Sequence, residues 1–162
     1  MVPPNTKLHA SIGEKFKKLW KYYLLQTSLA GIALFILVLI LGKGRIVAIS
    51  AMGATAFIVF AMPTAVSAQA RNVIGGNLAG LVAGTIFYFT PFPYYLEYPL
   101  AVGIAIFVMV ALDVQHPPAA GTALAVVIHE VYPLDVFVAI MASALILSQC
   151  HYYLRHHLKD LI

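Results

Sequence analysis

Residues 22–41 read YYLLQTSLAGIALFILVLIL, and none of these 20 positions carries a charged side chain. A helix needs about 20 apolar residues to cross the hydrocarbon core of a bilayer. Lysines at positions 15, 17, 18 and 21 precede the stretch, and Gly42-Lys43-Gly44-Arg45 follows it. A cleaved signal peptide would have a shorter apolar core and a small-residue cleavage site in place of these last two cations. The stretch therefore predicts a retained membrane-spanning helix.

The composition of the whole chain also points to a lipid environment. Of its 162 residues, 62% are hydrophobic and 10% are charged, and the mean hydropathy is +0.90. A soluble domain has about 25% charged residues, and a disordered chain has few apolar ones. We expect residues 1–21 to form a basic cytoplasmic segment, residues 22–154 a single membrane domain, and residues 155–162 a cytoplasmic tail. The 133 residues from 22 to 154 carry only seven charges: Lys43, Arg45, Arg71, Glu97, Asp113, Glu130 and Asp135.

Five further apolar segments follow, at residues 46–62, 73–89, 98–112, 119–128 and 136–153. Segment 119–128 is short for a crossing, so it either crosses the membrane or turns back within it. The positive-inside rule distinguishes these two cases. Six crossings with the N-terminus inside place eight of the Lys and Arg residues inside and only Lys43 and Arg45 outside, whereas a re-entrant 119–128 segment gives six against four. We predict an all-α membrane bundle of six segments in a bacterial plasma membrane, or less favourably an organelle inner membrane, with both termini cytoplasmic.

An internal repeat relates the two halves of the membrane domain. GIALFILVLI at 31–40 aligns with GIAIFVMVAL at 103–112 at five identical positions of ten, and AMGAT at 51–55 then aligns with AAGTA at 119–123. Three crossings per half would make residues 22–89 and 98–153 two inverted three-helix repeats, an architecture typical of secondary transporters. The alternative is chance resemblance between apolar helices.

The repeat predicts two equivalent helix breaks, one at Ser50 to Gly53 and one from Asp113 to Pro118. Proline is tolerated at the start of a helix, so Pro118 marks the start of a short fifth helix that begins inside the bilayer. Unpaired N–H groups at such a start favour a small anion. The small residues Gly53, Ala119 and Gly121 would let the backbone approach this anion, and Thr55 and Thr122 would add hydroxyl donors.

The segment DVQHPPAAGTAL at 113–124 resembles the signature of the HPP family of integral membrane proteins, and QARNVIGGN at 69–77 is similar to its second motif, departing at Ala70 where the family has proline. The resemblance implies nitrite transport, which is associated with members from cyanobacteria and plastids. The family is commonly described with four spans, against the six expected here.

Two residues of these motifs have competing interpretations. Arg71 is either an anchor of the third helix at the headgroups or a cation that draws an anion to the site, with Asn72 and Asn77 as polar contacts. His116 caps its helix as a neutral imidazole, assists the anion as a cation, or relays a proton with Asp113. The anion-binding residues that we predict are Ser50, Gly53, Thr55, Arg71, Asn72, Asn77, His116, Pro117, Ala119, Gly121 and Thr122, with Asp113 and His116 as the candidate proton relay.

Three classes of function were compared. The first is a secondary transporter or facilitator of a small inorganic anion, with nitrite as the leading candidate. The second is a membrane scaffold or subunit in which Gly75, Gly76, Gly80 and Gly84 only allow close helix packing. An intramembrane enzyme ranks last, because no catalytic pattern is present. We expect no metal, since His151, His156 and His157 are read as solvated tail residues, no cofactor and no nucleic acid; membrane lipid and a homo-oligomer are the expected partners.

Overall fold

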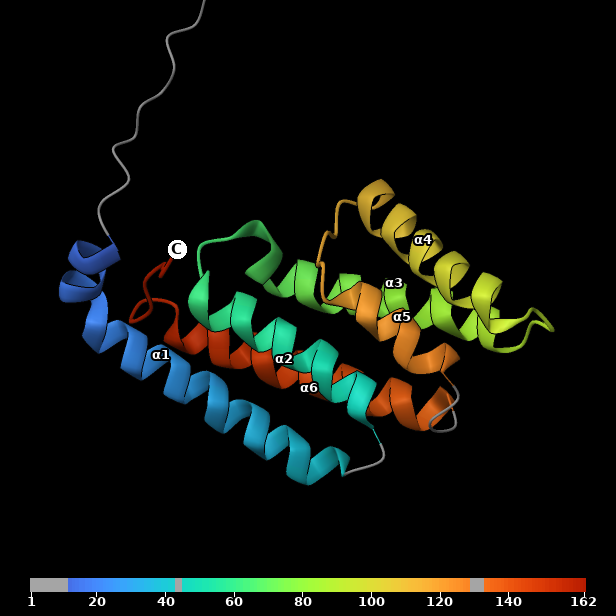
Figure 1. Ribbon diagram of the computed structural model, residues 1–162, viewed down its shortest axis with the longest axis horizontal. Helices are drawn as coiled ribbons and strands as arrows, with labels where there is room; N and C mark the ends of the chain where they lie inside the picture. The colour runs from blue at the N-terminus through green and yellow to red at the C-terminus, as the bar shows by residue number, and fades with distance from the viewer. Residues whose placement is uncertain (1–11, 43–44, 129–132) are drawn as a thin grey trace, which may run out of the picture.

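All regular secondary structure in the computed structural model is helical within the residues that it describes, which are 12–42, 45–128 and 133–162 (Figure 1). Three segments of this part, Ile12–Ile40, Tyr94–Ala111 and Leu134–Leu154, are long and apolar enough to cross a membrane, and Ile46–Ala61 is a shorter apolar helix. The elements in chain order are α1 (Ile12–Leu41), α2 (Ile46–Ala61), the 3₁₀ turn η1 (Val66–Ala68), α3 (Ala70–Tyr88), α4 (Tyr94–Ala111), α5 (Ala119–Val127) and α6 (Pro133–Leu154).

Helices α2 to α6 coincide with the five later apolar segments to within a few residues at each end. The predicted start of the short helix at Pro118 is confirmed, since Pro118 is the N-cap of α5 and its backbone is helical. Helix α1 begins earlier than the apolar stretch, at Ile12, with Glu14 in its first turn. Lysine is a good helix former, and an acidic residue suits a helix N-terminus, so the basic segment continues the helix.

The predicted break at Ser50 to Gly53 is wrong. Helix α2 runs without interruption through both residues, and the Ser50 hydroxyl donates to the Ile46 carbonyl one turn back at 2.9 Å. Glycine in a helix interior costs about 0.5–1 kcal/mol relative to alanine, but it removes no backbone hydrogen bond. Because no proline accompanies Gly53, and backbone groups in an apolar environment keep their partners, the helix stays intact.

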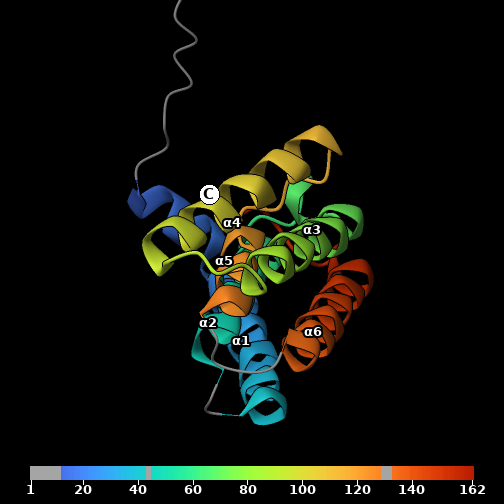
Figure 2. The same ribbon diagram turned by 90° about the vertical axis from the view of Figure 1, so that its right-hand side faces the viewer.

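Helix α5 occupies the centre of the bundle and packs against α2, α3, α4 and α6 (Figures 1 and 2). The end of the chain lies beside the end of α2 and the first half of α1. The Leu161 N–H donates to the Ala61 carbonyl at 3.0 Å, and the Gln26 side chain donates to the Lys159 carbonyl at 2.8 Å and accepts from its N–H at 3.1 Å. The start of α1, the end of α2 and the end of α6 therefore share one end of the bundle (Figure 1).

A row of glycines lets α3 approach α5 closely. A Cβ atom added to Gly80 would lie 2.3 Å from the Ala119 carbonyl oxygen, and one on Gly84 would lie 2.6 Å from the Ala123 oxygen. A Cβ on Gly76 would lie 2.5 Å from the Cβ of His116. The three glycines recur every four residues, so they share one face of α3, and backbone meets backbone along this face.

Replacing Gly80 with alanine should destabilise the fold, because its methyl group would overlap the Ala119 carbonyl. We expect a loss of about 1–3 kcal/mol, as for other overpacked cores, measured by thermal unfolding in detergent. The control is Gly103→Ala on α4, where an added Cβ has nothing within 4 Å. Equal stability of the two variants would contradict the close α3–α5 contact.

Candidate functional site

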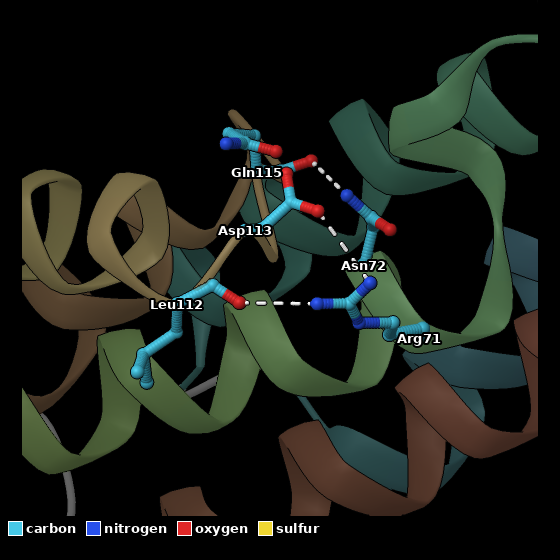
Figure 3. A network of polar contacts seen from close by, with 5 residues as sticks. All are labelled: Arg71, Asn72, Leu112, Asp113 and Gln115. Atoms are coloured by element: carbon cyan, nitrogen blue, oxygen red, sulfur yellow. Dashed lines mark hydrogen bonds and ion pairs between the residues drawn. The ribbon is translucent and has the colours of Figure 1, made fainter.

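The two motifs, which are about 40 residues apart in the chain, meet at one end of α3. The segment between α4 and α5, residues 112–118, lies against the first turn of α3 (Figure 3). The Arg71 guanidinium donates to the Leu112 carbonyl at 3.2 Å and lies 3.5 Å from the Asp113 carboxylate. The Asn72 amide donates to the Gln115 carbonyl at 3.1 Å. Residues 69–77 therefore hold the start of the other motif, residues 113–124, in place.

The turn that ends α4 is a Schellman motif. Asp113 has a left-handed backbone with φ of 54°, a conformation in which Asp is more common than most residues. Its N–H donates to the Val110 carbonyl at 3.3 Å, and the Val114 N–H donates to the Met109 carbonyl at 2.9 Å. These two bonds satisfy carbonyls that a helix end leaves free and turn the chain back toward the bundle.

His116 is fully buried and joins three elements. Its Nδ1 lies 2.8 Å from the Ser67 carbonyl oxygen, beside α3, and its Nε2 lies 3.0 Å from the Thr55 hydroxyl of α2. A carbonyl oxygen only accepts, so Nδ1 carries the hydrogen. In the neutral ring Nε2 then accepts from Thr55, whose oxygen also lies 3.0 Å from the Ala51 carbonyl. The His116 side chain therefore links the start of α5 to η1 and α2, and it does not cap α5 as the first interpretation expected.

A second buried polar pair lies next to His116. The Thr122 hydroxyl of α5 donates to Asn77 Oδ1 of α3 at 2.6 Å, and the Asn77 amide donates to the Val73 carbonyl at 2.7 Å. Both side chains have an exposed fraction of 0%. The predicted residues Thr55, Asn77, His116 and Thr122 thus lie together where α2, α3 and α5 meet.

The expectation of unpaired amides at the start of α5 is wrong. The N–H groups of Ala119, Ala120 and Gly121 donate to the carbonyls of His116, Pro117 and Pro118 at 2.9, 3.2 and 2.9 Å. Bonds from residue i to i−3 tighten the first turn and use the donors that a helix start leaves free. The groups that remain available to a ligand in this region are side chains.

The other predicted residues are distributed around this centre. Ala119 is buried against α3, and a Cβ on Gly121 would lie 3.4 Å from Ala51 of α2. Ser50 and Pro117 are exposed, and Gly53 faces Leu34 of α1. The candidate proton relay is not joined in this arrangement, since Asp113 is paired with Arg71 while the His116 nitrogens contact Ser67 and Thr55.

Two contributions escaped the sequence interpretation. The Ser67 carbonyl, which orients His116, is a backbone group of the 3₁₀ turn η1, and no residue type signals it. Glu97 was counted only as one of seven charges, yet its exposed fraction is 5% and its Oε1 has no hydrogen-bond partner. An acidic residue directly before an apolar segment was the signal that could have singled it out.

A helical bundle with apolar helices of spanning length and a polar centre defines a helical integral membrane protein. The family model described as HPP, transmembrane region, matches residues 15–157. The chain therefore belongs to the HPP family, as the resemblance of residues 113–124 predicts. Comparisons with curated proteins and with solved structures find no match.

Replacing Thr55 with valine should leave the buried His116 Nε2 without a partner while keeping the shape of the side chain. A buried acceptor left unsatisfied costs about 1–3 kcal/mol, which thermal unfolding in detergent would detect. Ser50→Ala, which removes an exposed hydroxyl from the same helix, is the matched control, and we expect its stability to change by no more than about 0.5 kcal/mol. A stable Thr55→Val variant would show that the Thr55–His116 bond contributes little.

Proposed function

We propose that this membrane protein carries a small inorganic anion across its membrane as a secondary transporter or facilitator, with nitrite as the leading candidate. The observation that supports this most strongly is the polar centre, formed by Thr55, Asn77, His116 and Thr122, all with an exposed fraction of 0%. Polar groups in the interior of a membrane domain are costly and usually mark a solute pathway. A bundle that only needed to pack could use apolar residues there.

The donors at the polar centre suit an anion. The hydroxyls of Thr55 and Thr122, the Asn77 amide and a His116 ring N–H are all hydrogen-bond donors. In this arrangement their acceptors are Asn77 Oδ1, His116 Nε2 and the carbonyls of Val73 and Ser67, so a transported anion would replace one of these acceptors. Such an exchange needs α5 to shift relative to α3 and α2. Small residues along α3 and α5 make a short sliding motion sterically feasible.

A cavity of about 290 Å³ adjoins the start of α5. It is several times larger than the volume of one water molecule, about 30 Å³. Gln115 and His116 are its polar side chains, and the rest of its lining is apolar: Ile106, Met109, Val110, Pro117 and Ala120. This space provides room next to the donors for α5 to move.

Arg71 lies beside Leu112 and Asp113, at the start of the segment that leads to this cavity, and in the proposed function the anion arrives there. The side chains of Arg71 and Asp113 are 63% and 72% exposed, so their ion pair is worth little and an incoming anion can compete for the guanidinium. Arg71 also fixes the Leu112 carbonyl. In the proposed function the cation attracts the anion, and the hydrogen bonds of Arg71 and Asn72 keep the 112–118 segment in place.

We further propose that the two halves form an inverted repeat, which supplies equivalent inward-open and outward-open arrangements for alternating access. The packing of the helices supports this interpretation. The first two helices of each half pack on each other, α1 on α2 and α4 on α5. The second helix of each half packs on the third helix of the other half, α2 on α6 and α5 on α3. The correspondence is incomplete, because α4 contacts α3 far more than α1 contacts α6.

A membrane scaffold is the second candidate, and the glycine row of α3 is the observation that favours it. Gly80 and Gly84 are covered by α5 and Gly76 by the segment that precedes it, however, so these glycines offer no free face to another protein. Exposed apolar side chains on α1, such as Phe35 and Leu39, suit lipid or a second copy of the chain. The scaffold accounts for the glycines and for the interhelical hydrogen bonds of the polar centre, but it gives no role to the cavity beside His116.

The topology can be tested with single cysteines in a Cys150→Ala background. Exposed positions 66 and 157 should be labelled from the cytoplasmic side, and exposed position 94 from the outside. Position 132, also expected outside, lies beyond the described residues, so Asp135, which is exposed, replaces it. Labelling of positions 66 and 157 from opposite sides would overturn the six-segment topology.

Transport can be tested with purified protein in liposomes at pH 7.5 or above, where empty liposomes give the background permeability to nitrite. We expect nitrite uptake above that background. Arg71→Gln should lower uptake most at low nitrite concentration, because the guanidinium acts before the anion reaches the centre, and Arg71→Lys should restore part of it. Thr122→Val should lower the maximal rate, since it removes a central donor.

The matched control is Arg155→Gln, which removes an exposed cation that lies over the Tyr152 ring. Its uptake should equal that of the unmodified protein. Chloride and nitrate as competitors would report the selectivity. Uptake equal to that of empty liposomes would overturn the transport proposal and leave the scaffold.

A further inference from the structure

Glu97 lies in the first turn of α4, at the end of the bundle opposite Arg71 and Asp113. Its neighbours Tyr94 and Tyr95 are 67% and 64% exposed, whereas Glu97 is 5% exposed. Its Oε1 is buried without a hydrogen bond. Among the described residues, no Lys, Arg or His forms a salt bridge with this carboxyl group.

The face of α4 that carries Glu97 packs on apolar residues. Ala101, one turn further along this face, belongs to a buried cluster with Ala83 of α3 and with Ala123 and Val127 of α5. Helix α5 has no titratable side chain, and those of α3 are Arg71, at its far end, and Tyr88. On α4 itself the other titratable side chains are Tyr94, Tyr95 and Tyr98.

An ionised carboxylate that is buried without a hydrogen bond or a cation is costly, whereas a carboxylic acid is much less so. A proton is therefore the ligand that Oε1 lacks. The position at the start of a helix offers the opposite influence, because the helix dipole favours a negative group there.

We propose that Glu97 is a proton-binding site that couples transport of the anion to movement of a proton, an inference that rests on the proposed function. The carboxylate takes a proton from water on one side of the membrane to become the carboxylic acid, and after α4 and α5 rearrange it returns that proton to water on the other side. One anion and one proton together carry no net charge. An anion moving into a compartment with negative potential would otherwise move against the field.

The experiment compares Glu97→Gln with the unmodified protein in liposomes that contain a pH-sensitive dye, with nitrite as the probe. The unmodified protein should acidify the lumen as nitrite enters, above the acidification in empty liposomes. Glu97→Gln keeps the size of the neutral acid, so nitrite should still move down its own gradient, but the accompanying acidification should fall to the level of empty liposomes. Asp135→Asn removes an exposed carboxylate from the start of α6, at the same end of the bundle, and should behave as the unmodified protein (Figure 1).

Acidification by Glu97→Gln equal to that of the unmodified protein would overturn the proposal. If the unmodified protein moves no nitrite, the proposed function fails, and infrared spectroscopy of the protein in liposomes decides the proton site separately. A protonated-carboxyl band in the unmodified protein that is lost in Glu97→Gln but kept in Asp135→Asn would support proton binding at Glu97. The same spectrum in all three would overturn it. Thermal unfolding of each variant shows that the fold is retained.

Discussion

Backbone polar groups find no water inside a bilayer, and the rest of this structure depends on how residues 112–118 meet that constraint. The segment leaves α4, enters the bundle and starts α5 beside the middle of α2 and α3. Its backbone groups are satisfied by the Schellman turn at Asp113, by Arg71 and Asn72 on α3, and by the tight first turn of α5. His116 and Pro118 are the buried part of the segment, and non-helical backbone is tolerated at membrane depth only where protein surrounds it. The two family motifs are thus two halves of one structural unit.

The glycine row on α3 is what makes this enclosure possible. Side chains at Gly76 or Gly80 would push His116 or Ala119 away from α3. With α5 at this distance, Thr122 reaches Asn77, and His116 reaches both Thr55 and the Ser67 carbonyl. The polar centre therefore depends on residues that have no side chain of their own. The glycines and the polar groups therefore depend on each other. A substitution at one of these glycines would also change the hydrogen bonds of the polar centre.

Much of the fold follows from the sequence, because the length of an apolar run and the position of a proline act locally. The helix ends and the start of α5 at Pro118 belong to this class. The continuity of α2 at Gly53 and the pairing of the α5 amides are local as well, because no proline interrupts α2 and the amides donate to carbonyls three residues back, but the internal repeat suggested breaks there instead. Thr55 and Asn77 were predictable as polar residues in an apolar region. That Thr55 pairs with His116 and Asn77 with Thr122 was not predictable, because the pairs join different helices. The burial of Glu97 depends on α3 and α5 covering one face of α4, which a single helix cannot reveal.

Helix α5 is the element through which the two ends of the bundle can communicate. Near its start it is linked to α3 by Asn77 and Thr122, and near its end it packs with the alanines that follow Glu97 on α4. Its contacts with α3 are made by small residues, which resist sliding less than interdigitated large side chains do. A shift that separates Thr122 from Asn77 would also change the apolar cover of Glu97. Anion release at the centre and proton release at the end would then be two consequences of one movement.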